Sequence, residues 1–238
     1  MLEDRSGQRI PKVTLPVRED GEWKELDTEK FFAGKTVVVF SLPGAFTPTC
    51  SSAHVPRYDE LASAFEGHGV DEIVCVAVND TFVMDAWQED QEADTIHFLA
   101  DGNGTFTEAM GMLVDKAAIG FGKRSWRYSM LVKDGTIEKM FIEPQKDGDP
   151  YEVSDADTML RHIAPDAKLP ADIFMLSKDG CAHCARARDL LDVREMDYDE
   201  LEATPRTLRA VPGGGTTPQI FIDGQHIGGA DELEAHLK

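Results

Sequence analysis

The 238-residue sequence contains few cysteines and no long hydrophobic run, and both shortages limit what the protein can be. Four cysteines in a chain of this length do not make the disulfide framework of a small secreted domain. No apolar stretch approaches the roughly 20 residues needed to cross a bilayer. The first residues also lack the apolar centre of a signal peptide. We therefore expect a cytoplasmic protein without a membrane partner.

Positive charge is also scarce, because 24 lysines and arginines stand against 44 aspartates and glutamates, giving a formal net charge of −20. A field of this sign repels nucleic acid and anionic membrane surfaces. We therefore expect no nucleic-acid partner. An anionic substrate would need a local positive charge where it binds.

The spacing of the cysteines argues against a metal centre. Only Cys181 and Cys184 form a C-x-x-C pair, whereas Cys50 and Cys75 are isolated in the sequence. Structural zinc sites usually combine such a pair with a second pair of cysteines or histidines. We therefore expect no metal site and no tightly bound cofactor.

Apolar, β-branched runs alternate with amphipathic segments through the first two thirds of the chain. Strands are expected at residues 36–42, 73–78, 96–100, 127–133 and 137–142, and helices at residues 51–65, 81–91 and 155–163. Asp134-Gly135, between the last two strands, is a strong hairpin signal. This order predicts an α/β domain, which we assign to residues 1–165.

A second, smaller α/β domain is expected after a linker. The chain carries two prolines and little apolar content just before residue 171, and we place the linker at residues 166–171. Beyond it, strands are expected at residues 173–177 and 219–223, and helices at residues 184–191 and 231–237. Residues 172–238 are long enough for a minimal domain.

Cys50 is the first candidate reactive residue. It follows an expected strand and a Pro-Gly turn, and it stands at the start of an expected helix. The free N–H groups and the positive dipole end of a helix stabilise a thiolate, the reactive form of cysteine. Thr47 can offer a hydroxyl to the sulfur or to a bound oxygen, and Pro43 can shield the site from water. On spacing alone, an ordinary buried helix cysteine is a nearly equal alternative.

The string Pro-Gly-Ala-Phe-Thr-Pro-Thr-Cys-Ser at residues 43–51 resembles the active-site loop of peroxiredoxins, in particular the type-five subgroup. The similarity continues through residues 78–80, 99–101 and 127–130, and it covers about residues 5–160. It implies a decorated thioredoxin fold. It also implies a thiol peroxidase that reduces hydrogen peroxide and small alkyl hydroperoxides.

The resemblance gives the residues of this site their expected roles. Cys50 would attack the terminal oxygen of a peroxide and become a sulfenic acid. Thr47 would orient the peroxide, and Arg127 would supply positive charge beside the thiolate and the developing oxyanion. The backbone N–H groups of residues 49 and 50 would complete the anion site. Arg124 is the rival for the arginine role, and we prefer Arg127 because it directly precedes an apolar strand.

The other cysteine of the first domain, Cys75, lies inside an expected buried strand and is interpreted as a core residue. No cysteine lies between Cys75 and Cys181, so Cys50 lacks a resolving partner in its own domain. The enzyme therefore resembles a one-cysteine peroxidase that borrows its reductant. The resemblance also implies a homo-oligomer, a dimer or a tetramer.

Cys181-Ala182-His183-Cys184 follows an expected strand and opens an expected helix. In a cytosolic chain, a C-x-x-C pair in this context indicates thioredoxin-like redox chemistry. The first cysteine of the pair gains most from the helix end, so Cys181 is the expected nucleophile.

Several positions around this pair resemble glutaredoxins, over about residues 172–238: Lys178, Thr217, Pro218, Gly229 and Asp231. The resemblance implies a second thioredoxin fold with a cis peptide bond before Pro218. Lys178 and Asp231 would bind the charged ends of glutathione, and the Thr217 backbone would pair with its cysteinyl part. Gly229 would let the tripeptide approach closely.

Lys178 and His183 each keep an alternative interpretation. Lys178 is an ordinary surface charge in that alternative, because structural ion pairs and solvated lysines are common. His183 departs from the pattern, since an aromatic residue is common at this position of glutaredoxins. It either perturbs the neighbouring thiols or simply faces solvent.

Together, the two resemblances imply a hybrid of peroxiredoxin and glutaredoxin with glutathione as co-substrate. Glutathione would condense with the sulfenic acid of Cys50, and Cys181 would then take the glutathione over by thiol–disulfide exchange. The covalent fusion would raise the effective concentration of the reductase. The alternatives are a peroxide sensor or holdase, a deglutathionylating disulfide reductase, and an iron–sulfur carrier.

Overall fold

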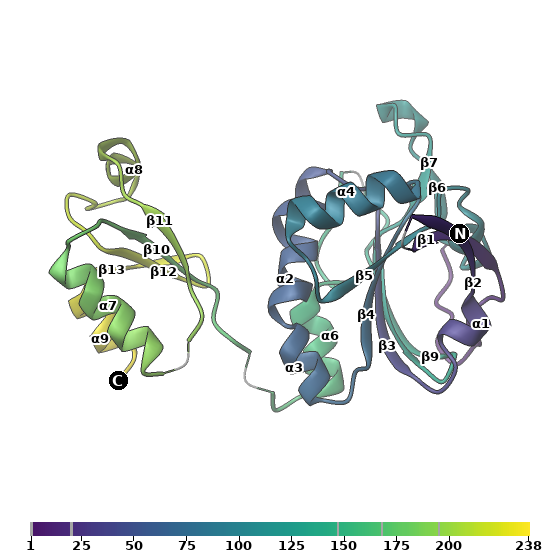
Figure 1. The fold of residues 1–238 in the computed structure, drawn as a ribbon, viewed down its shortest axis with the longest axis horizontal. Helices are drawn as coiled ribbons and strands as arrows, with labels where there is room; N and C mark the ends of the chain where they lie inside the picture. Colours follow the sequence, from purple (N-terminus) through teal and green to yellow (C-terminus); the bar gives the residue numbers. More distant parts are fainter. Residues whose placement is uncertain (1, 20, 147, 168, 195) are drawn as a thin grey trace. The chain divides into compact units, whose positions relative to one another are not determined.

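The structure is a computed structural model that describes residues 2–19, 21–146, 148–167, 169–194 and 196–238. The chain divides into two compact units, Met1–Ala167 and Lys168–Lys238 (Figure 1). Each unit has the mixed α/β class that the sequence predicted. The linker expected at residues 166–171 stays a prediction, and its Lys168 lies outside the described residues.

A five-stranded sheet forms the centre of the first unit. Its strands are β3 (Thr36–Leu42), β4 (Glu72–Ala77), β5 (Ile96–Ala100), β8 (Tyr128–Lys133) and β9 (Thr136–Ile142), in the spatial order β5-β4-β3-β8-β9. The first three strands run parallel to one another, whereas β8 and β9 pair antiparallel. All five lie within a residue of the positions predicted from the sequence.

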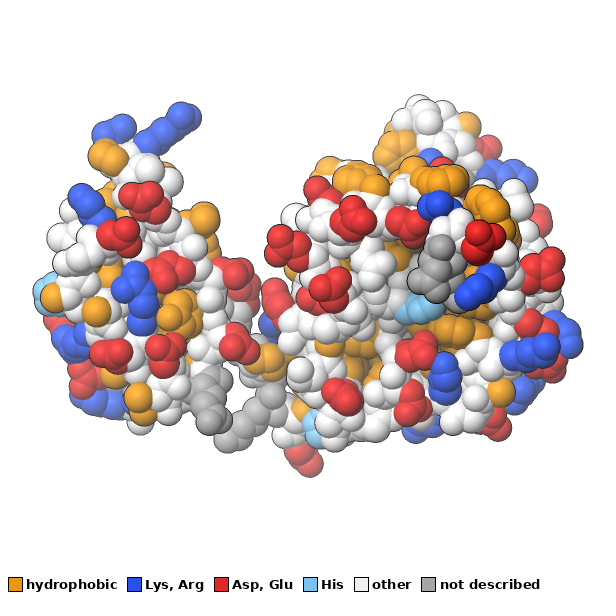
Figure 2. All heavy atoms as spheres, in the orientation of Figure 1, with side chains coloured by type: hydrophobic (Ala, Val, Ile, Leu, Met, Phe, Trp, Pro, Cys, Tyr) orange, Lys and Arg blue, Asp and Glu red, His pale blue; other side chains and the backbone are white. Residues whose placement is uncertain are grey.

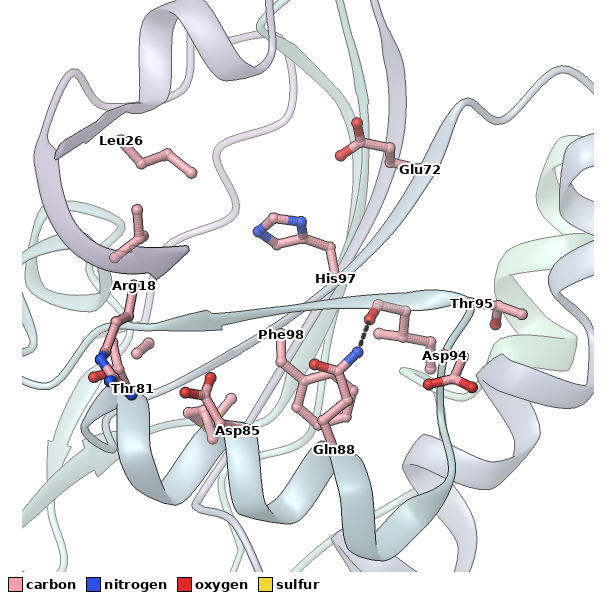
Figure 3. A pocket seen from close by; sticks show the side chains of 14 residues that line it. Arg18, Leu26, Glu72, Thr81, Asp85, Gln88, Asp94, Thr95, His97 and Phe98 are labelled. Carbon is pink, nitrogen blue, oxygen red and sulfur yellow. Dashed lines mark hydrogen bonds between the residues drawn. The ribbon is translucent and has the colours of Figure 1, made fainter. Parts of the chain in front are cut away.

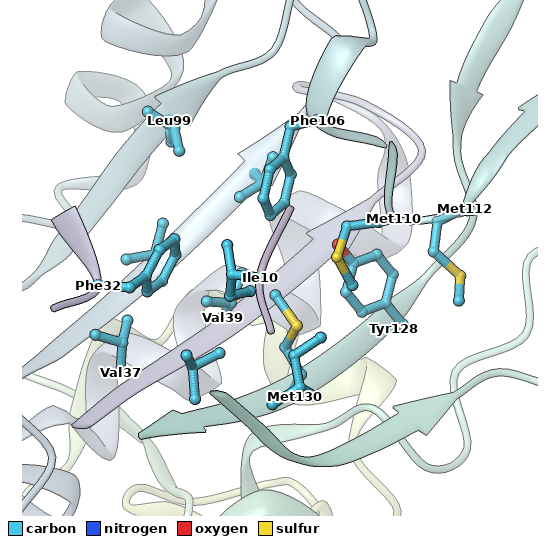
Figure 4. Packing of buried hydrophobic residues seen from close by; sticks show 14 of the residues in the cluster. Ile10, Phe32, Val37, Val39, Leu99, Phe106, Met110, Met112, Tyr128 and Met130 are labelled. Atoms are coloured by element: carbon cyan, nitrogen blue, oxygen red, sulfur yellow. The ribbon is translucent and has the colours of Figure 1, made fainter. Parts of the chain in front are cut away.

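Strand β3 contributes side chains to both faces of this sheet, because successive residues of a strand point in opposite directions. Val37 and Val39 belong to the hydrophobic cluster of Figure 4. Val38 and Phe40 are equally buried, and the Phe40 ring stacks on Tyr58 with ring centroids 4.2 Å apart. Burial on both faces accounts for the uninterrupted apolar run of this strand.

Helices cover one face of the sheet: α2 (Val55–Glu60), α3 (Ala62–Gly67), α4 (Thr81–Gln91) and α6 (Ala156–Ile163) (Figure 1). The hairpin of β1 (Thr14–Glu19) and β2 (Glu22–Asp27) lies on the other face with α1 (Thr28–Phe31). Helix α5 (Thr105–Ala109) precedes a second hairpin of β6 (Leu113–Asp115) and β7 (Lys123–Ser125). The sequence did not predict these two hairpins, α1 or α5.

The prediction of one continuous helix over residues 51–65 is wrong. The chain instead forms a π-helical turn at Cys50–His54, followed by α2 and, after an interruption at Leu61, by α3. Pro56 gives the physical reason for the first change, because it has no N–H with which to continue the α-helical ladder. The N–H of Val55 donates to the carbonyl of Cys50, five residues back, as in a π-bulge.

The second unit contains a four-stranded sheet. Its strands are β10 (Ile173–Ser177), β11 (Asp199–Glu202), β12 (Gln219–Ile222) and β13 (Gln225–Gly228), in the order β11-β10-β12-β13. Helices α7 (Ala182–Asp192) and α9 (Ala230–His236) pack together beside the sheet, and α8 (Pro205–Ala210) follows β11 (Figure 1). Residues of β10, β12, α7 and α9 form the core. The sequence did not predict β11, β13 or α8.

Candidate active sites

Cys50 lies in the helical segment that follows β3 in the chain. A short loop after Leu42 leads into this segment, and Cys50 occupies its first turn. Within the loop, Phe46 has a positive φ of 58° and a side chain that is 53% exposed. Cys50 itself is fully buried. The helix start expected from the sequence is thus present, with the thiol turned into the protein.

Arg127 is the cation that reaches Cys50. Ser41 of β3 pairs with Tyr128 of β8, so the residue before Tyr128 lies at the end of β3 from which the Cys50 loop departs. The Arg127 side chain is only 1% exposed. Its guanidinium lies close enough to the sulfur for its charge to favour the thiolate and lower the pKa of Cys50.

Thr47 is the second polar neighbour of the Cys50 sulfur. Its hydroxyl donates to the carbonyl of Gly44 at 2.8 Å and also lies within hydrogen-bonding reach of the thiol. A hydroxyl carries a single hydrogen, so Thr47 can donate to only one of these acceptors at a time. Pro43 is half-buried at the start of the same loop.

His54 holds the Arg127 guanidinium through a hydrogen bond. Its Nδ1 lies 2.9 Å from Nη1 of Arg127, and its Nε2 lies 3.2 Å from the carbonyl oxygen of Ser154. A guanidinium only donates and a carbonyl only accepts, so the proton sits on Nε2 and Nδ1 accepts. Burial and the charge of Arg127 hold the pKa of His54 well below its usual value. The imidazole is therefore a neutral, fixed acceptor.

One buried carboxylate holds the loop that faces this histidine. Glu143 is 1% exposed and accepts hydrogen bonds from the backbone N–H groups of Glu152, Val153 and Ser154 and from the Ser154 hydroxyl, at 2.7–2.9 Å. These donors offset the cost of burying its charge. The carbonyl of Ser154 is thereby held where His54 and the Tyr58 hydroxyl can both donate to it.

Burial dominates the acidity of both cysteines in the first unit. It raises the pKa of the Cys50 thiol, while Arg127 and the Thr47 hydroxyl oppose that rise. Burial also raises the pKa of Cys75 well above its usual value. Cys75 lies in β4, paired with Phe40 of β3 and fully buried, which is the position expected for a core residue.

The rival arginine contacts a different part of the loop. Arg124 lies in β7 and donates from Nη1 to the carbonyl of Val78. Its guanidinium borders Gly44 in the Cys50 loop. The geometry thus brings Arg127 to the sulfur and Arg124 to the backbone of the loop. Which arginine serves the chemistry stays a prediction.

Cys181 caps the N-terminus of α7, and Cys184 lies within its first turn. The N–H of Cys184 donates to Sγ of Cys181 at 3.1 Å, and the hydroxyl of Thr217 lies 3.5 Å from the same sulfur. Partial burial acts to raise the pKa of Cys181, but hydrogen bonds from Cys184, Thr217 and the backbone of His183 outweigh it and lower the pKa. Burial raises the pKa of Cys184. Cys181 is therefore the better nucleophile of the pair.

The residues expected to bind glutathione come from three segments around Cys181. The peptide bond between Thr217 and Pro218 is cis, as the resemblance implies, and the Thr217 carbonyl lies 3.5 Å from Sγ of Cys181. Gly229 begins α9, and a side chain added there would contact the carbonyl of Pro218. Lys178 is exposed after β10, and its carbonyl accepts from the N–H of Cys181 at 3.3 Å.

Asp231 is paired with an arginine. Its carboxylate lies 2.6 Å from Nη1 of Arg186 in α7, and Arg186 also pairs with Glu234. The Asp231 side chain is 76% exposed, so this pair contributes little to stability and can exchange partners. His183 is exposed, and its side chain therefore faces solvent.

The sequence matches two family models, Redoxin over residues 5–160 and Glutaredoxin over residues 173–227. It is 54% identical over 240 residues to hybrid peroxiredoxin hyPrx5 of Haemophilus influenzae, covering 99% of this chain and 100% of that protein. The chain belongs to the hybrid peroxiredoxins. Peroxiredoxin sll1621 of Synechocystis is 51% identical over 185 residues, which cover 71% of this chain and 98% of that protein.

Solved structures resemble the peroxiredoxin part of this hybrid peroxiredoxin. Reduced Prx3 of Vibrio vulnificus in complex with H₂O₂ is 44% identical, with a TM-score of 0.63, over 66% of this chain and 98% of that chain. A 1-Cys peroxiredoxin of Plasmodium falciparum is 32% identical, with a TM-score of 0.65, over 68% and 99% of the two chains. The hybrid peroxiredoxin thus joins two thioredoxin-fold domains and is a peroxidase of the oxidoreductase class. Its glutaredoxin domain implies an interaction with glutathione.

Four polar residues of the hybrid peroxiredoxin's sites were not predicted from the sequence: His54, Glu143, Asp149 and Arg186. Asp149 pairs with Arg127, its Oδ2 lying 2.5 Å from Nη2. His54 alone left a signal, because it follows Cys50 by one helical turn. Glu143, Asp149 and Arg186 reach their partners through tertiary contacts, which local spacing in the sequence does not predict.

A cavity of about 410 Å³ opens in the hybrid peroxiredoxin between the β1–β2 hairpin and α4, where Arg18, Asp85 and His97 contribute to its wall (Figure 3). None of the predicted site residues lines it.

Acidic side chains are spread over the visible face of each unit (Figure 2). Among the described residues, no His, Cys, Asp and Glu group suits a metal ion, and no helix has the length and apolarity of a membrane span.

Proposed function

We propose that the protein is a glutathione-dependent thiol peroxidase that reduces hydrogen peroxide and small alkyl hydroperoxides at Cys50. The observation that carries this proposal is the placement of a fully buried thiol in the first turn of a helical segment, against the guanidinium of Arg127. A buried thiol favours a small oxidant over a bulky one. The arginine Nε–H has no hydrogen-bond partner, which leaves a donor for an incoming oxygen.

The first half of the cycle oxidises Cys50. Its thiolate attacks the terminal oxygen of the peroxide, a sulfur–oxygen bond forms, and the oxygen–oxygen bond breaks. The leaving oxygen departs with the electron pair of that bond and takes up a proton, giving water or an alcohol. Arg127 stabilises the negative charge that develops on the oxygens, and Thr47 orients the peroxide. Cys50 is left as a sulfenic acid.

The second half returns Cys50 to the thiolate. Glutathione condenses with the sulfenic acid, releasing water and leaving a mixed disulfide on Cys50. The Cys181 thiolate attacks the glutathione sulfur of this disulfide and frees Cys50. A second glutathione then attacks the disulfide on Cys181, releasing glutathione disulfide. One peroxide is thus reduced for every two glutathione molecules oxidised.

Glutathione binding is assigned to the residues around Cys181. The ammonium of Lys178 would hold one carboxylate of the tripeptide, and Asp231 would accept from its amino group after exchanging its exposed partner Arg186. The Thr217 backbone would pair with the cysteinyl part beside the cis peptide bond. Gly229 leaves room for the peptide to approach. Lys178 also supplies the local positive charge that an anionic substrate needs on an acidic protein.

We also propose a homo-oligomer, a dimer or a tetramer. Three exposed apolar side chains support this: Phe46 in the Cys50 loop, and Ile119 and Phe121 at the tip of the β6–β7 hairpin. The Phe121 ring lies 6.0 Å from the guanidinium of Arg124, which itself borders the loop. Exposed apolar groups gathered in one region are typical of subunit contacts. The molar mass in solution, measured by light scattering, tests this, and a monomer would contradict it.

Steady-state peroxide consumption with glutathione as the sole reductant tests the proposed cycle. Cys50→Ser should abolish turnover, because no sulfenic acid can form, whereas Cys75→Ser is the matched control and should keep it. Cys181→Ser should lose sustained glutathione-dependent turnover while Cys50 still undergoes one oxidation. Full turnover in Cys50→Ser would overturn the peroxidase assignment. A single oxidation in wild type without turnover would favour a sensor instead.

A further inference from the structure

A carboxylate lies against the catalytic arginine of the first unit, and the peroxidase cycle gives it no task. Asp149 sits in the loop between β9 and α6, and its Oδ2 is 2.5 Å from Nη2 of Arg127. The arginine side chain is 1% exposed and the aspartate 39%, so the pair spans the boundary between interior and solvent. An ion pair with one member buried is screened less than a surface pair.

We propose that Asp149 restrains Cys50 through Arg127: its carboxylate neutralises part of the Arg127 charge and thereby lowers the fraction of reactive thiolate. The proposal rests on the peroxidase function assigned to Cys50. Arg127 favours the thiolate because it is a cation beside the sulfur, so any anion paired with it weakens that effect. The charge of Asp149 raises the pKa of the Cys50 thiol, whereas the charge of Arg127 lowers it.

Asp149 is not needed to hold Arg127 in place. His54 accepts from Nη1 of the same guanidinium, and the Tyr151 ring lies 5.6 Å from its central carbon. Removing only the charge of Asp149 should therefore leave the arginine where it is. The Asp149→Asn substitution does this, because an asparagine Oδ1 can still accept from Nη2.

The other titratable groups near this site do not carry the effect. His54 stays neutral, and burial raises the pKa values of Tyr58, Tyr151 and Cys75, so all four are uncharged at neutral pH. Carboxylates at the start of α6 face Tyr151 and Arg57, and Arg124 faces the carbonyl of Val78. Asp149 is the only described carboxylate ion-paired with Arg127.

The test compares the pH dependence of Cys50 in four proteins that carry Cys181→Ser and Cys184→Ser, so that no other accessible thiol titrates. They are the parent, Asp149→Asn, Asp149→Glu, and Glu152→Gln as the matched control. Glu152 belongs to the same loop but pairs with Lys146, so its loss removes one negative charge without touching Arg127. Thiolate absorbance and the second-order rate constant with hydrogen peroxide are measured from acid to alkaline pH.

Asp149→Asn should shift the thiolate titration to lower pH and raise the peroxide rate constant about three- to tenfold on the acid side, where one pKa unit corresponds to tenfold in thiolate. The rate constants should converge at alkaline pH, Glu152→Gln should match the parent, and Asp149→Glu should return the profile towards the parent. A change of less than twofold on the acid side, or slower reaction at every pH, would overturn the proposal. A shifted titration without peroxide reaction in any protein would instead overturn the peroxidase function.

Discussion

The two cysteines that we propose to react stand at equivalent places in two related folds, yet their surroundings shift their pKa values in opposite directions. Cys50 and Cys181 both follow a strand and begin a helical segment. Burial raises the pKa of Cys50, whereas hydrogen bonds lower the pKa of the half-exposed Cys181. The helix start alone therefore does not decide reactivity. The balance of burial, charge and hydrogen bonds does.

This difference fits the different partners of the two thiols. In the proposed cycle Cys50 meets a small peroxide, so it can remain inside the protein and rely on the buried cation Arg127. In the same proposed cycle Cys181 meets glutathione, a tripeptide, and it stays at the surface between the cis peptide bond and the start of α9. At the first site, the charge of buried Arg127 favours the Cys50 thiolate. At the second site, backbone N–H groups and the Thr217 hydroxyl favour the Cys181 thiolate at the surface.

The largest expected effect comes from the cation at the buried site. Arg127→Lys keeps a positive charge but loses the planar fork of donors that holds the guanidinium between His54 and Asp149. We expect the rate constant of Cys50 with hydrogen peroxide to fall about 100- to 1000-fold, the range for losing one oxyanion donor. Stopped-flow fluorescence with excess peroxide measures it.

The matched control for this substitution is Arg124→Lys, since Arg124 borders the Cys50 loop without reaching the sulfur. We expect this variant to lose less than about tenfold, because a lysine keeps the positive charge and a donor for the Val78 carbonyl. If Arg124→Lys were the slower of the two, the roles of the two arginines would have to be exchanged.

A smaller effect is expected when a donor is removed from the exposed site. Thr217→Val deletes the hydroxyl that lies 3.5 Å from Sγ of Cys181, so the pKa of this thiol should rise. Because fewer molecules then carry a thiolate, alkylation of Cys181 at acidic pH should slow by up to about tenfold. The difference should vanish at alkaline pH. Identical profiles in Thr217→Val and wild type would show that the hydroxyl does not tune Cys181.

The smallest effect concerns the stability of the buried site. Folded His54 stays neutral because its pKa is depressed, whereas the unfolded chain takes up a proton below about pH 6.5. This contribution to the free energy of unfolding is therefore complete above that pH. It is lost on acidification at up to about 1.4 kcal/mol per pH unit. Denaturant unfolding followed by tryptophan fluorescence measures it, since Trp23, Trp87 and Trp126 all lie in the first unit.

His54→Gln provides the comparison for this measurement. A glutamine offers an acceptor for Arg127 and a donor for the Ser154 carbonyl but does not titrate in this range. The acid loss of stability should therefore be shallower in the variant. An equal pH slope in both proteins would mean that His54 is not held neutral in the folded state.

Local patterns were enough to predict much of both folds. The central strands of the first unit could be placed because buried parallel strands are continuous apolar runs. Asp134-Gly135 marked its hairpin, and both residues have positive φ values, 45° and 70°. Asp223-Gly224 is the same signal, with φ values of 50° and 74°, and it joins β12 to β13, a strand that was not predicted.

Other features of the sites depend on contacts between residues that are far apart in the sequence. The motif pointed to Cys50, Thr47 and Arg127, and the structure brings them together. The carbonyl that fixes His54 belongs to Ser154, 100 residues along the chain. Such a contact follows from how the β9–α6 loop folds back on Glu143, which no local spacing encodes.

The most direct test of the relay is the intact mass of the protein after one equivalent of peroxide followed by glutathione. Wild type and Cys184→Ser should return to the reduced mass, because only Cys181 is needed to remove the glutathione. Cys181→Ser should retain one glutathione, mapped by peptide analysis to Cys50. Equal clearance of glutathione in Cys181→Ser and wild type would contradict the account.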